Sequence, residues 1–222
     1  DSTYIAKILK TNSNFINSFT VSFNDTKYDE SVWAKEVIDK YDLNSKIIEF
    51  DTSNFGFEIM ETIESLDEPY ADPSIIPSYI LSKKISENFK VAISGDGGDE
   101  LFFGYDRTIR AVNGFKFSNW FINSIFYFYP YIFGSGARIL SKSNNPSVAY
   151  KSFLSDLKLR KNIFGNKTGY FDFDSTFINT GSVLKTCLLS DFKFYLPEMM
   201  LLKIDRTSMA NSLEVRSPFV DH

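Results

Sequence analysis

Apolar and polar residues follow two different rhythms along the first hundred positions of the chain. A spacing of three to four residues, as in Ile5, Ile8 and Leu9, predicts amphipathic helices, and short runs of β-branched and aromatic residues predict strands. The expected helices cover about residues 1–10, 29–41, 55–66 and 77–88, and the expected strands are 18–23, 46–50 and 90–94. Such alternation is typical of the α/β class, in which helices cover both faces of a parallel sheet.

The second half of the chain has a less regular pattern. Residues 117–137, "FSNWFINSIFYFYPYIFGSGA", carry no charge and are rich in aromatic residues, but Pro130 and Gly134 interrupt the run. We expect a helical insertion that packs on the core or faces a partner, rather than a membrane span. The predicted parts are an ATP-binding α/β core (1–109), a mostly helical insertion (110–190), which includes an amphipathic helix at 147–164, and a helical segment that closes the cleft (191–222).

Composition narrows the set of partners. The chain has 24 Lys and Arg against 28 Asp and Glu, and because the basic residues are scattered we expect no nucleic-acid partner. The single cysteine, Cys187, cannot form an internal disulfide, and its apolar neighbours predict a buried thiol. No signal-peptide pattern opens the chain, so we expect a cytoplasmic protein. One histidine, His222, is too few for a zinc site, and it gives little support to a histidine-based triad.

Three glycines and three carboxylates follow the third expected strand in "SGDGGDE", residues 94–100. Ligands of open parallel sheets bind at the carboxyl ends of strands, and glycines let an anion approach the backbone closely. The continuation "DELFFGY" predicts a helix whose first N–H groups would face that anion. Because carboxylates repel phosphates, a magnesium ion between them would create a site for a metal-bound nucleotide. The alternative is an ordinary acidic turn in which Asp96 and Asp99 cap the helix.

Two further segments combine polar residues with a helical pattern. "DEPYADPSIIPSY", residues 67–79, contains three prolines that predict a loop leading into a helix, and a rigid surface loop is the alternative. "LLKIDRTSMANSLEVRSPFVDH", residues 201–222, mixes helical apolar spacing with four charged residues that would pair. An arginine fork in this segment could hold a carboxylate or a phosphate, whereas mutual bracing is the alternative. The four residues expected to pair are Asp205, Arg206, Glu214 and Arg216.

These segments, together with "DS" at residues 1–2, resemble the synthetase domain of the glutamine-hydrolysing asparagine synthetases. They occur in the order found in that family and span the whole chain. The resemblance implies a parallel-sheet nucleotide-binding fold of the adenine nucleotide alpha-hydrolase-like (HUP) type, with a helical insertion and a helical C-terminal part. β-Lactam synthetases and amidotransferases of surface-polysaccharide clusters are similar in the same regions.

The resemblance implies nucleotide-binding and metal-binding positions. Asp1 and Ser2 match the end of the family's pyrophosphate loop, SGGxDS, whose glycines this chain lacks. Asp1 and Asp99 match the magnesium ligands, and the adenosine end of ATP would lie against the backbone of the second strand and the "SG" pair. The matching nucleotide-binding positions are Asp1, Ser2, Val21, Ser94, Gly95 and Gly97.

The resemblance also implies catalytic and substrate-binding residues. Asp99 would act through the metal, and Asp96 or Glu214 would orient the amine and accept its proton. Asp96 is one methylene shorter than the glutamate of many relatives, which favours Glu214 for the direct role. The matching substrate-binding positions are Asp67, Asp72, Glu100, Asp205, Arg206 and Arg216.

The activity implied by the resemblance is an ATP-dependent amide-forming ligase that requires ATP and Mg²⁺. It would adenylate the side chain of aspartate and transfer ammonia to give asparagine, AMP and pyrophosphate. Two alternatives are a related amidotransferase or cyclising synthetase with another carboxylate substrate, and a non-catalytic nucleotide-binding scaffold. Relatives begin with a glutaminase domain and continue past "RSPF", so we expect a fragment whose missing glutaminase domain supplies ammonia in cis. A homodimer and the activity of the fragment alone are left open, and no membrane partner is expected.

Overall fold

The computed structural model describes the chain in several segments that fall into two units. The described residues are 1–13, 15–23, 29–50, 55–66, 68, 70, 72–116, 150 and 180–221. The first unit contains residues 1–97 and 198–222, and the second contains residues 98–197. Most of the expected helical insertion at 110–190 lies outside the described residues, including 117–137 and, apart from Tyr150, 147–164.

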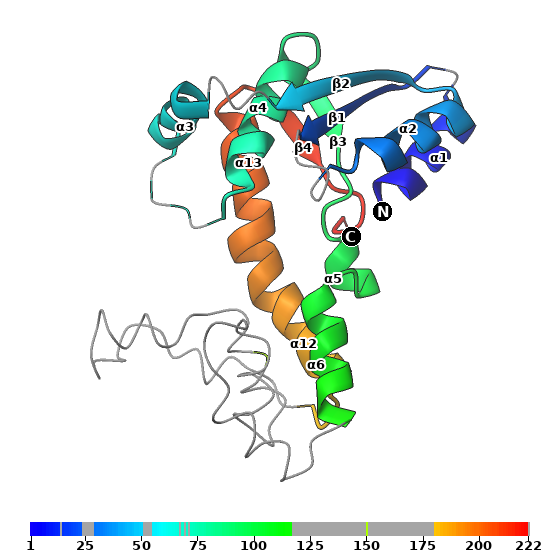
Figure 1. Ribbon diagram of the computed structural model, residues 1–222, viewed down its shortest axis with the longest axis vertical. Helices are drawn as coiled ribbons and strands as arrows, with labels where there is room; N and C mark the ends of the chain where they lie inside the picture. Colours follow the sequence, from blue (N-terminus) through cyan, green and yellow to red (C-terminus); the bar gives the residue numbers. More distant parts are fainter. Residues whose placement is uncertain are drawn as a thin grey trace. The chain divides into compact units, whose positions relative to one another are not determined.

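The first unit begins with a parallel strand pair and its crossover helix (Figure 1). Strand β1 (Asn17–Phe23) pairs in parallel with β2 (Asn44–Phe50), so that Val21 lies opposite Ile48. Helix α2 (Ser31–Tyr41) connects the strands and ends at Asp42, whose φ of 48° turns the chain out of the helix. Helix α1 (Ser2–Asn12) precedes β1 and packs against α2. These elements confirm the predicted alternation.

A small apolar core lies between the β1–β2 pair and helix α4 (Ile75–Ser86). Ile48 and Phe50 are buried on β2, whereas Glu49 between them is exposed, as expected for a strand with one covered face. Ile80 of α4 completes the cluster, and Phe19, Val21 and Phe23 of β1 pack against it. Helix α3 (Phe55–Glu64) contacts α4. Burial therefore alternates at the end of β2, whereas β1 is half-buried along most of its length.

A second parallel pair joins distant parts of the same unit. Strand β3 (Val91–Ile93) pairs with β4 (Glu214–Arg216), and Leu213, just before β4, is fully buried. We expected β3, but residues 191–222 were predicted to be helical, and the extended conformation of β4 comes from its pairing with β3. The parallel strands and helices confirm a mixed α/β class, while the HUP type stays a prediction.

The second unit is helical in its described part. It contains α5 (Gly98–Phe102), α6 (Asp106–Lys116) and α12 (Val183–Ser190), which is capped by the Ser182 hydroxyl. The π-helix η3 (Asp191–Leu201) contains Pro197, the last residue of this unit, and the following helix α13 (Leu202–Met209) belongs to the first unit. Ala111, Tyr150 and Cys187 form a buried cluster, which confirms the predicted burial of the thiol. None of the helices in the described segments has the length and apolar character needed to cross a bilayer.

Candidate functional site

The loop that follows β3 is held by the C-terminal segment of the same unit. Ser94 Oγ lies 2.9 Å from Ser217 Oγ, and the Ser94 N–H donates a hydrogen bond to the Arg216 carbonyl at 2.9 Å. Gly97 has a φ of 88°, and a Cβ at this position would lie only 2.4 Å from Val220 Cγ1. Glycine at 97 is therefore required both by the backbone conformation and by the close packing of Val220.

The same loop approaches the first turn of α1. A Cβ at Gly95 would lie 2.7 Å from Ser2 Oγ and 3.0 Å from the Ser2 backbone nitrogen. The first N–H groups of an α-helix have no acceptor within the helix, and they form the positive end of its dipole. Asp1 is the N-cap residue, but its side chain makes no capping hydrogen bond. The structure thus brings together Ser2 and Gly95, two residues predicted to bind the nucleotide, beside a helix N-terminus.

Two other predicted residues of this unit have unremarkable surroundings. Val21 is half-buried on β1, where it packs against the apolar core of the unit. Asp96 is half-buried in the loop between Gly95 and Gly97. Their assignments, to the nucleotide and to the amine, stay predictions.

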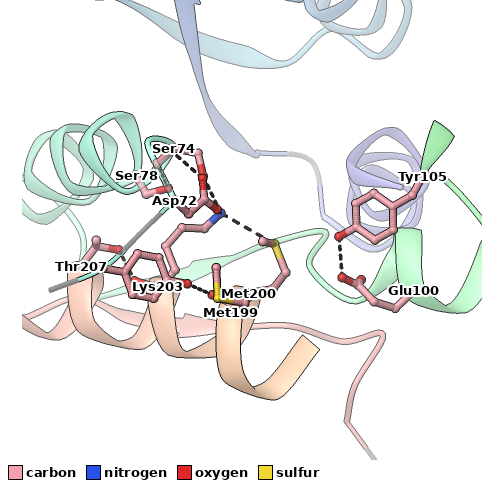
Figure 2. Close-up of polar contacts among 10 residues, drawn as sticks. Asp72, Ser74, Ser78, Glu100, Tyr105, Met199, Met200, Lys203 and Thr207 are labelled. Atoms are coloured by element: carbon pink, nitrogen blue, oxygen red, sulfur yellow. Dashed lines mark hydrogen bonds and ion pairs between the residues drawn. The ribbon is translucent and has the colours of Figure 1, made fainter. Parts of the chain in front are cut away.

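The two neighbouring carboxylates of α5 lie in opposite surroundings. Asp99 is exposed, whereas Glu100 has only 2% of its surface exposed. The Tyr105 hydroxyl donates a hydrogen bond to Glu100 Oε1 at 2.5 Å, as Figure 2 shows. Burial raises the pKa of Glu100, and the hydrogen bond from Tyr105 partly offsets this effect. Asp99 is therefore accessible to a ligand, while Glu100 is satisfied inside the second unit.

Arg107 is the centre of a polar cluster that sequence reasoning missed. Its guanidinium carbon lies 3.8 Å from the ring centroid of Tyr105 and 3.9 Å from that of Tyr195. The guanidinium also donates to Asp191 Oδ1 at 3.0 Å and to the Tyr150 hydroxyl at 3.1 Å. Tyr150 in turn donates to Asp191 Oδ2 at 2.5 Å. Arg107 and Asp191 are 84 residues apart, so no local pattern could connect them.

A second unpredicted residue, Lys203, binds the loop before α4. Its ammonium group lies 3.2 Å from Asp72 Oδ2 and 2.7 Å from Ser74 Oγ, and it contacts the Met200 sulfur at 3.7 Å (Figure 2). Burial opposes ionisation of Asp72, but hydrogen bonds from Ser74 and the charge of Lys203 outweigh it, so the pKa of Asp72 is lowered. The only signal in the sequence is a lysine flanked by apolar residues in "LLKI", which is too weak to assign a partner.

The predicted substrate-binding residues are therefore not equivalent. Asp72 is already engaged by Lys203, and Asp67 lies outside the described residues. Arg216 forms an ion pair with Glu214 at 2.8 Å, and both side chains are largely exposed on one face of β4. Arg206 is half-buried on α13. The expected pairing among the four C-terminal charges is thus confirmed for Glu214 and Arg216.

A groove of about 280 Å³ in the first unit carries two of these charges. Asp205 and Glu214 line it together with Ser208, Ser217 and an apolar set from α13, β4 and the segment beyond. The apolar set is Leu201, Ile204, Met209, Val215 and Val220. Because Ser217 also contacts Ser94, the groove adjoins the loop after β3. The groove combines apolar walls with two carboxylates, of which Glu214 is ion-paired with Arg216.

The carboxylates proposed for magnesium are chemically suited to that ion. Asp1 and Asp99 are exposed, and among the described residues neither side chain takes part in a hydrogen bond or ion pair. Magnesium prefers oxygen ligands and is commonly bound by one or two carboxylates together with substrate phosphates. In the described part of the chain, no three His, Cys, Asp or Glu side chains gather as a metal-binding group.

Comparison with known proteins identifies the family of the chain. The asparagine synthase family matches residues 1–222. The chain is 26% identical to asparagine synthetase [glutamine-hydrolyzing] 1 of Bacillus subtilis and to a putative asparagine synthetase [glutamine-hydrolyzing] of Mycobacterium bovis. Both matches cover the whole chain, which spans 37% and 36% of the respective relatives. A protein of Methanocaldococcus jannaschii with a similar description is 30% identical over 52% of the chain and 22% of its own length. The chain belongs to the asparagine synthase family.

Proposed function

We propose that the protein is an ATP-dependent ligase that adenylates the side-chain carboxylate of aspartate and transfers ammonia to it. The products would be asparagine, AMP and pyrophosphate. The observation that carries this proposal is the approach of Gly95 to Ser2 at the N-terminus of α1. This approach brings together "DS" (residues 1–2) and "SGDGGDE" (residues 94–100), the two segments that resemble nucleotide-binding motifs of the asparagine synthase family, to which the chain belongs.

The nucleotide would lie where the loop after β3 meets α1. The N-terminal N–H groups of α1, an 11-residue helix, would donate to phosphate oxygens, and the helix dipole would favour their charge. Gly95 keeps the loop backbone free of a side chain where it faces Ser2, Gly97 would contribute its backbone to the nucleotide site, and Ser94 is fixed by Ser217. Val21 of β1 would contribute backbone contacts to the adenosine end.

Asp1 and Asp99 would hold the magnesium ion. Their accessible carboxylates supply the oxygen ligands that this ion prefers, and phosphate oxygens would complete its coordination. When bound, magnesium would neutralise the negative charge that develops on the departing pyrophosphate.

Aspartate needs activation because an ionised carboxylate has no good leaving group. Its side-chain oxygen would attack the α-phosphorus of ATP, and the bond to the β-phosphate oxygen would break to release pyrophosphate. Ammonia would then attack the acyl carbon, and AMP would leave with the electron pair of the acyl–oxygen bond. Asp96 or Glu214 would orient the ammonia and accept the proton that it loses.

Residues of the groove are the best candidates to hold the amino-acid substrate. Asp205 lines it and would attract the substrate's α-ammonium group, while Glu214 on the same groove would face the reacting amine. Arg206 and Arg216 lie on the same two elements, and an arginine fork would suit the α-carboxylate. Asp72, which is held by Lys203, and Asp67, which lies outside the described residues, would reach the substrate's amino group from the segment before α4.

The remaining parts of the proposal concern the whole protein. The relatives named above are described as glutamine-hydrolyzing, and we propose that a glutaminase domain in the same polypeptide supplies the ammonia. We also propose that the protein acts in the cytoplasm, with a homodimer as a hypothesis. These statements go beyond the chain, which spans little more than a third of those relatives.

Exchange of labelled pyrophosphate into ATP by the full-length protein tests this function. We expect exchange that depends on aspartate, that is lost in Asp99→Asn, and that is unchanged in Asp39→Asn, a control at an exposed aspartate of α2. Exchange that survives Asp99→Asn would remove the metal role of Asp99. Exchange that responds to another carboxylate would indicate a related amidotransferase or synthetase, and nucleotide binding without any exchange would indicate a scaffold.

A further inference from the structure

Asp99 and Glu100 are adjacent in sequence but differ in what they can contact. Asp99 is exposed, whereas Glu100, at 2% exposure, is enclosed by protein. A buried carboxylate must receive hydrogen bonds from inside the protein, because water no longer solvates it. The Tyr105 hydroxyl provides such a bond at 2.5 Å. Glu100 is thus placed to bind the protein itself rather than a ligand that arrives from solvent.

The aromatic ring of Tyr105 packs against the guanidinium group of Arg107. The guanidinium lies 3.8 Å from the centre of the Tyr105 ring, at a distance typical of a cation–π contact. Tyr195 packs edge-to-face on Tyr105, with ring centroids 5.4 Å apart, and also contacts the guanidinium. Asp191, whose side chain is 3% exposed, neutralises Arg107 at 3.0 Å. A continuous series of contacts therefore runs from Asp191 through Arg107 and Tyr105 to Glu100.

These contacts matter because α5 is only five residues long. So short a helix has little stability of its own and depends on tertiary contacts. The chain leaves α5 through Phe103, whose φ is 63°, and the Gly104 N–H bonds back to the Asp99 carbonyl at 3.0 Å. A Cβ at Gly104 would lie only 1.8 Å from Asp99 Oδ1. Because glycine has no Cβ, the Asp99 carboxylate can occupy this space.

We propose that Glu100, Tyr105 and Arg107 are positioning residues that hold α5 in place and thereby present the Asp99 carboxylate to a divalent cation. The inference rests on the metal role of Asp99 in the proposed function. It gives Glu100 an internal role in place of the substrate contact predicted from the sequence. Removal of the Tyr105 hydroxyl should therefore weaken metal binding although it leaves both aspartates proposed as ligands unchanged.

Nucleotide binding with and without Mg²⁺ tests the inference without any catalytic step. Calorimetric titration of the full-length protein with α,β-methylene-ATP gives two affinities, and their ratio is the gain due to magnesium. Asp99→Asn should abolish this gain. Tyr105→Phe should reduce the magnesium-dependent gain by about tenfold, which is the smallest effect expected for loss of a hydrogen bond to a charged group. The affinity measured without Mg²⁺ should be unchanged. Glu100→Gln should cause a similar reduction, and the double variant should be little worse than either single one because both changes weaken the same contact.

Controls separate positioning from a general loss of structure. Tyr41→Phe removes a tyrosine hydroxyl from the end of α2 in the first unit, and should leave the magnesium-dependent gain unchanged. If Tyr105→Phe does not fold, as judged by circular dichroism, Glu100→Gln serves as the test. Absence of any magnesium-dependent gain in the wild-type protein would overturn the metal role and this inference together. A gain that Asp99→Asn abolishes, but that Tyr105→Phe and Glu100→Gln retain in full, would refute this inference alone.

Discussion

The contact between Lys203 and Asp72 should contribute measurably to the stability of the first unit. The two charged groups lie 3.2 Å apart, and their side chains are only 9% and 18% exposed. Loss of one partner from a fully buried ion pair costs about 3–5 kcal/mol, because the other charge stays buried and uncompensated. Asp72 retains the Ser74 N–H as a donor at 2.9 Å and partial access to water. For Lys203→Met, which keeps the apolar stem, we therefore expect a loss of about 2–3 kcal/mol, below that range.

The same contact predicts how stability depends on pH. Although burial opposes ionisation, the bonds from Ser74 and Lys203 lower the pKa of Asp72 below the ordinary value of 3.8. A group with a lowered pKa stabilises the folded state fully above its unfolded pKa, and this contribution is lost as the pH falls through the folded pKa. The wild-type protein should therefore lose part of its stability below about pH 4. This acid-dependent loss should be smaller in Lys203→Met, because one of the interactions that lower the pKa is absent.

Thermal and urea unfolding of the wild-type and variant proteins would measure both effects. For a chain of this length, about 2–3 kcal/mol corresponds to a decrease in Tm of roughly 4–12 °C. Lys35→Met, at an exposed lysine of α2, is the matched control and should change stability by less than about 0.5 kcal/mol. Asp72→Asn should also destabilise, and the double variant should fall short of the sum by about 1–2 kcal/mol. Strictly additive effects, or a Lys203→Met variant as stable as the control, would refute the reasoning.

Two further predictions concern the packing of single residues. Gly97→Ala should lower the free energy of unfolding by about 1–3 kcal/mol, because residue 97 has a positive φ and its new Cβ would collide with Val220. The control Gly56→Ala, in open space on α3, should be neutral or stabilising. Equal Tm values for the two variants would contradict this prediction. Cys187 is fully buried, and burial raises the pKa of its thiol to about 12. Peptide mapping should therefore show almost no labelling of Cys187 by a thiol reagent until the protein is unfolded. Rapid labelling of the native protein would contradict this prediction, because it would show that the thiol is accessible.

The elements predicted best are those with a distinctive local composition or spacing. The short run of β-branched and aromatic residues at 46–50 predicted β2 without any knowledge of its neighbours, and in the structure Ile48 and Phe50 are buried on either side of exposed Glu49. Boundaries were less accurate: α5 ends at Phe102, although "DELFFGY" predicted a longer helix. The left-handed conformation of Phe103 ends it, and the adjacent Gly104 provides space for Asp99, a three-dimensional requirement that composition does not express.

By itself, the sequence determined the mixed α/β class, the strand-to-helix alternation, the glycine-rich loop after β3 and the family resemblance, because each depends on residues that are close together in the chain. Only the tertiary structure decided that β4 pairs with β3 and that Ser94 meets Ser217, 123 residues away. It also decided that Asp99 is exposed and its neighbour Glu100 buried, and that Lys203 binds Asp72. The physical reason is that burial and ion pairing depend on which distant elements pack together, and local hydrophobic periodicity carries no information about such partners.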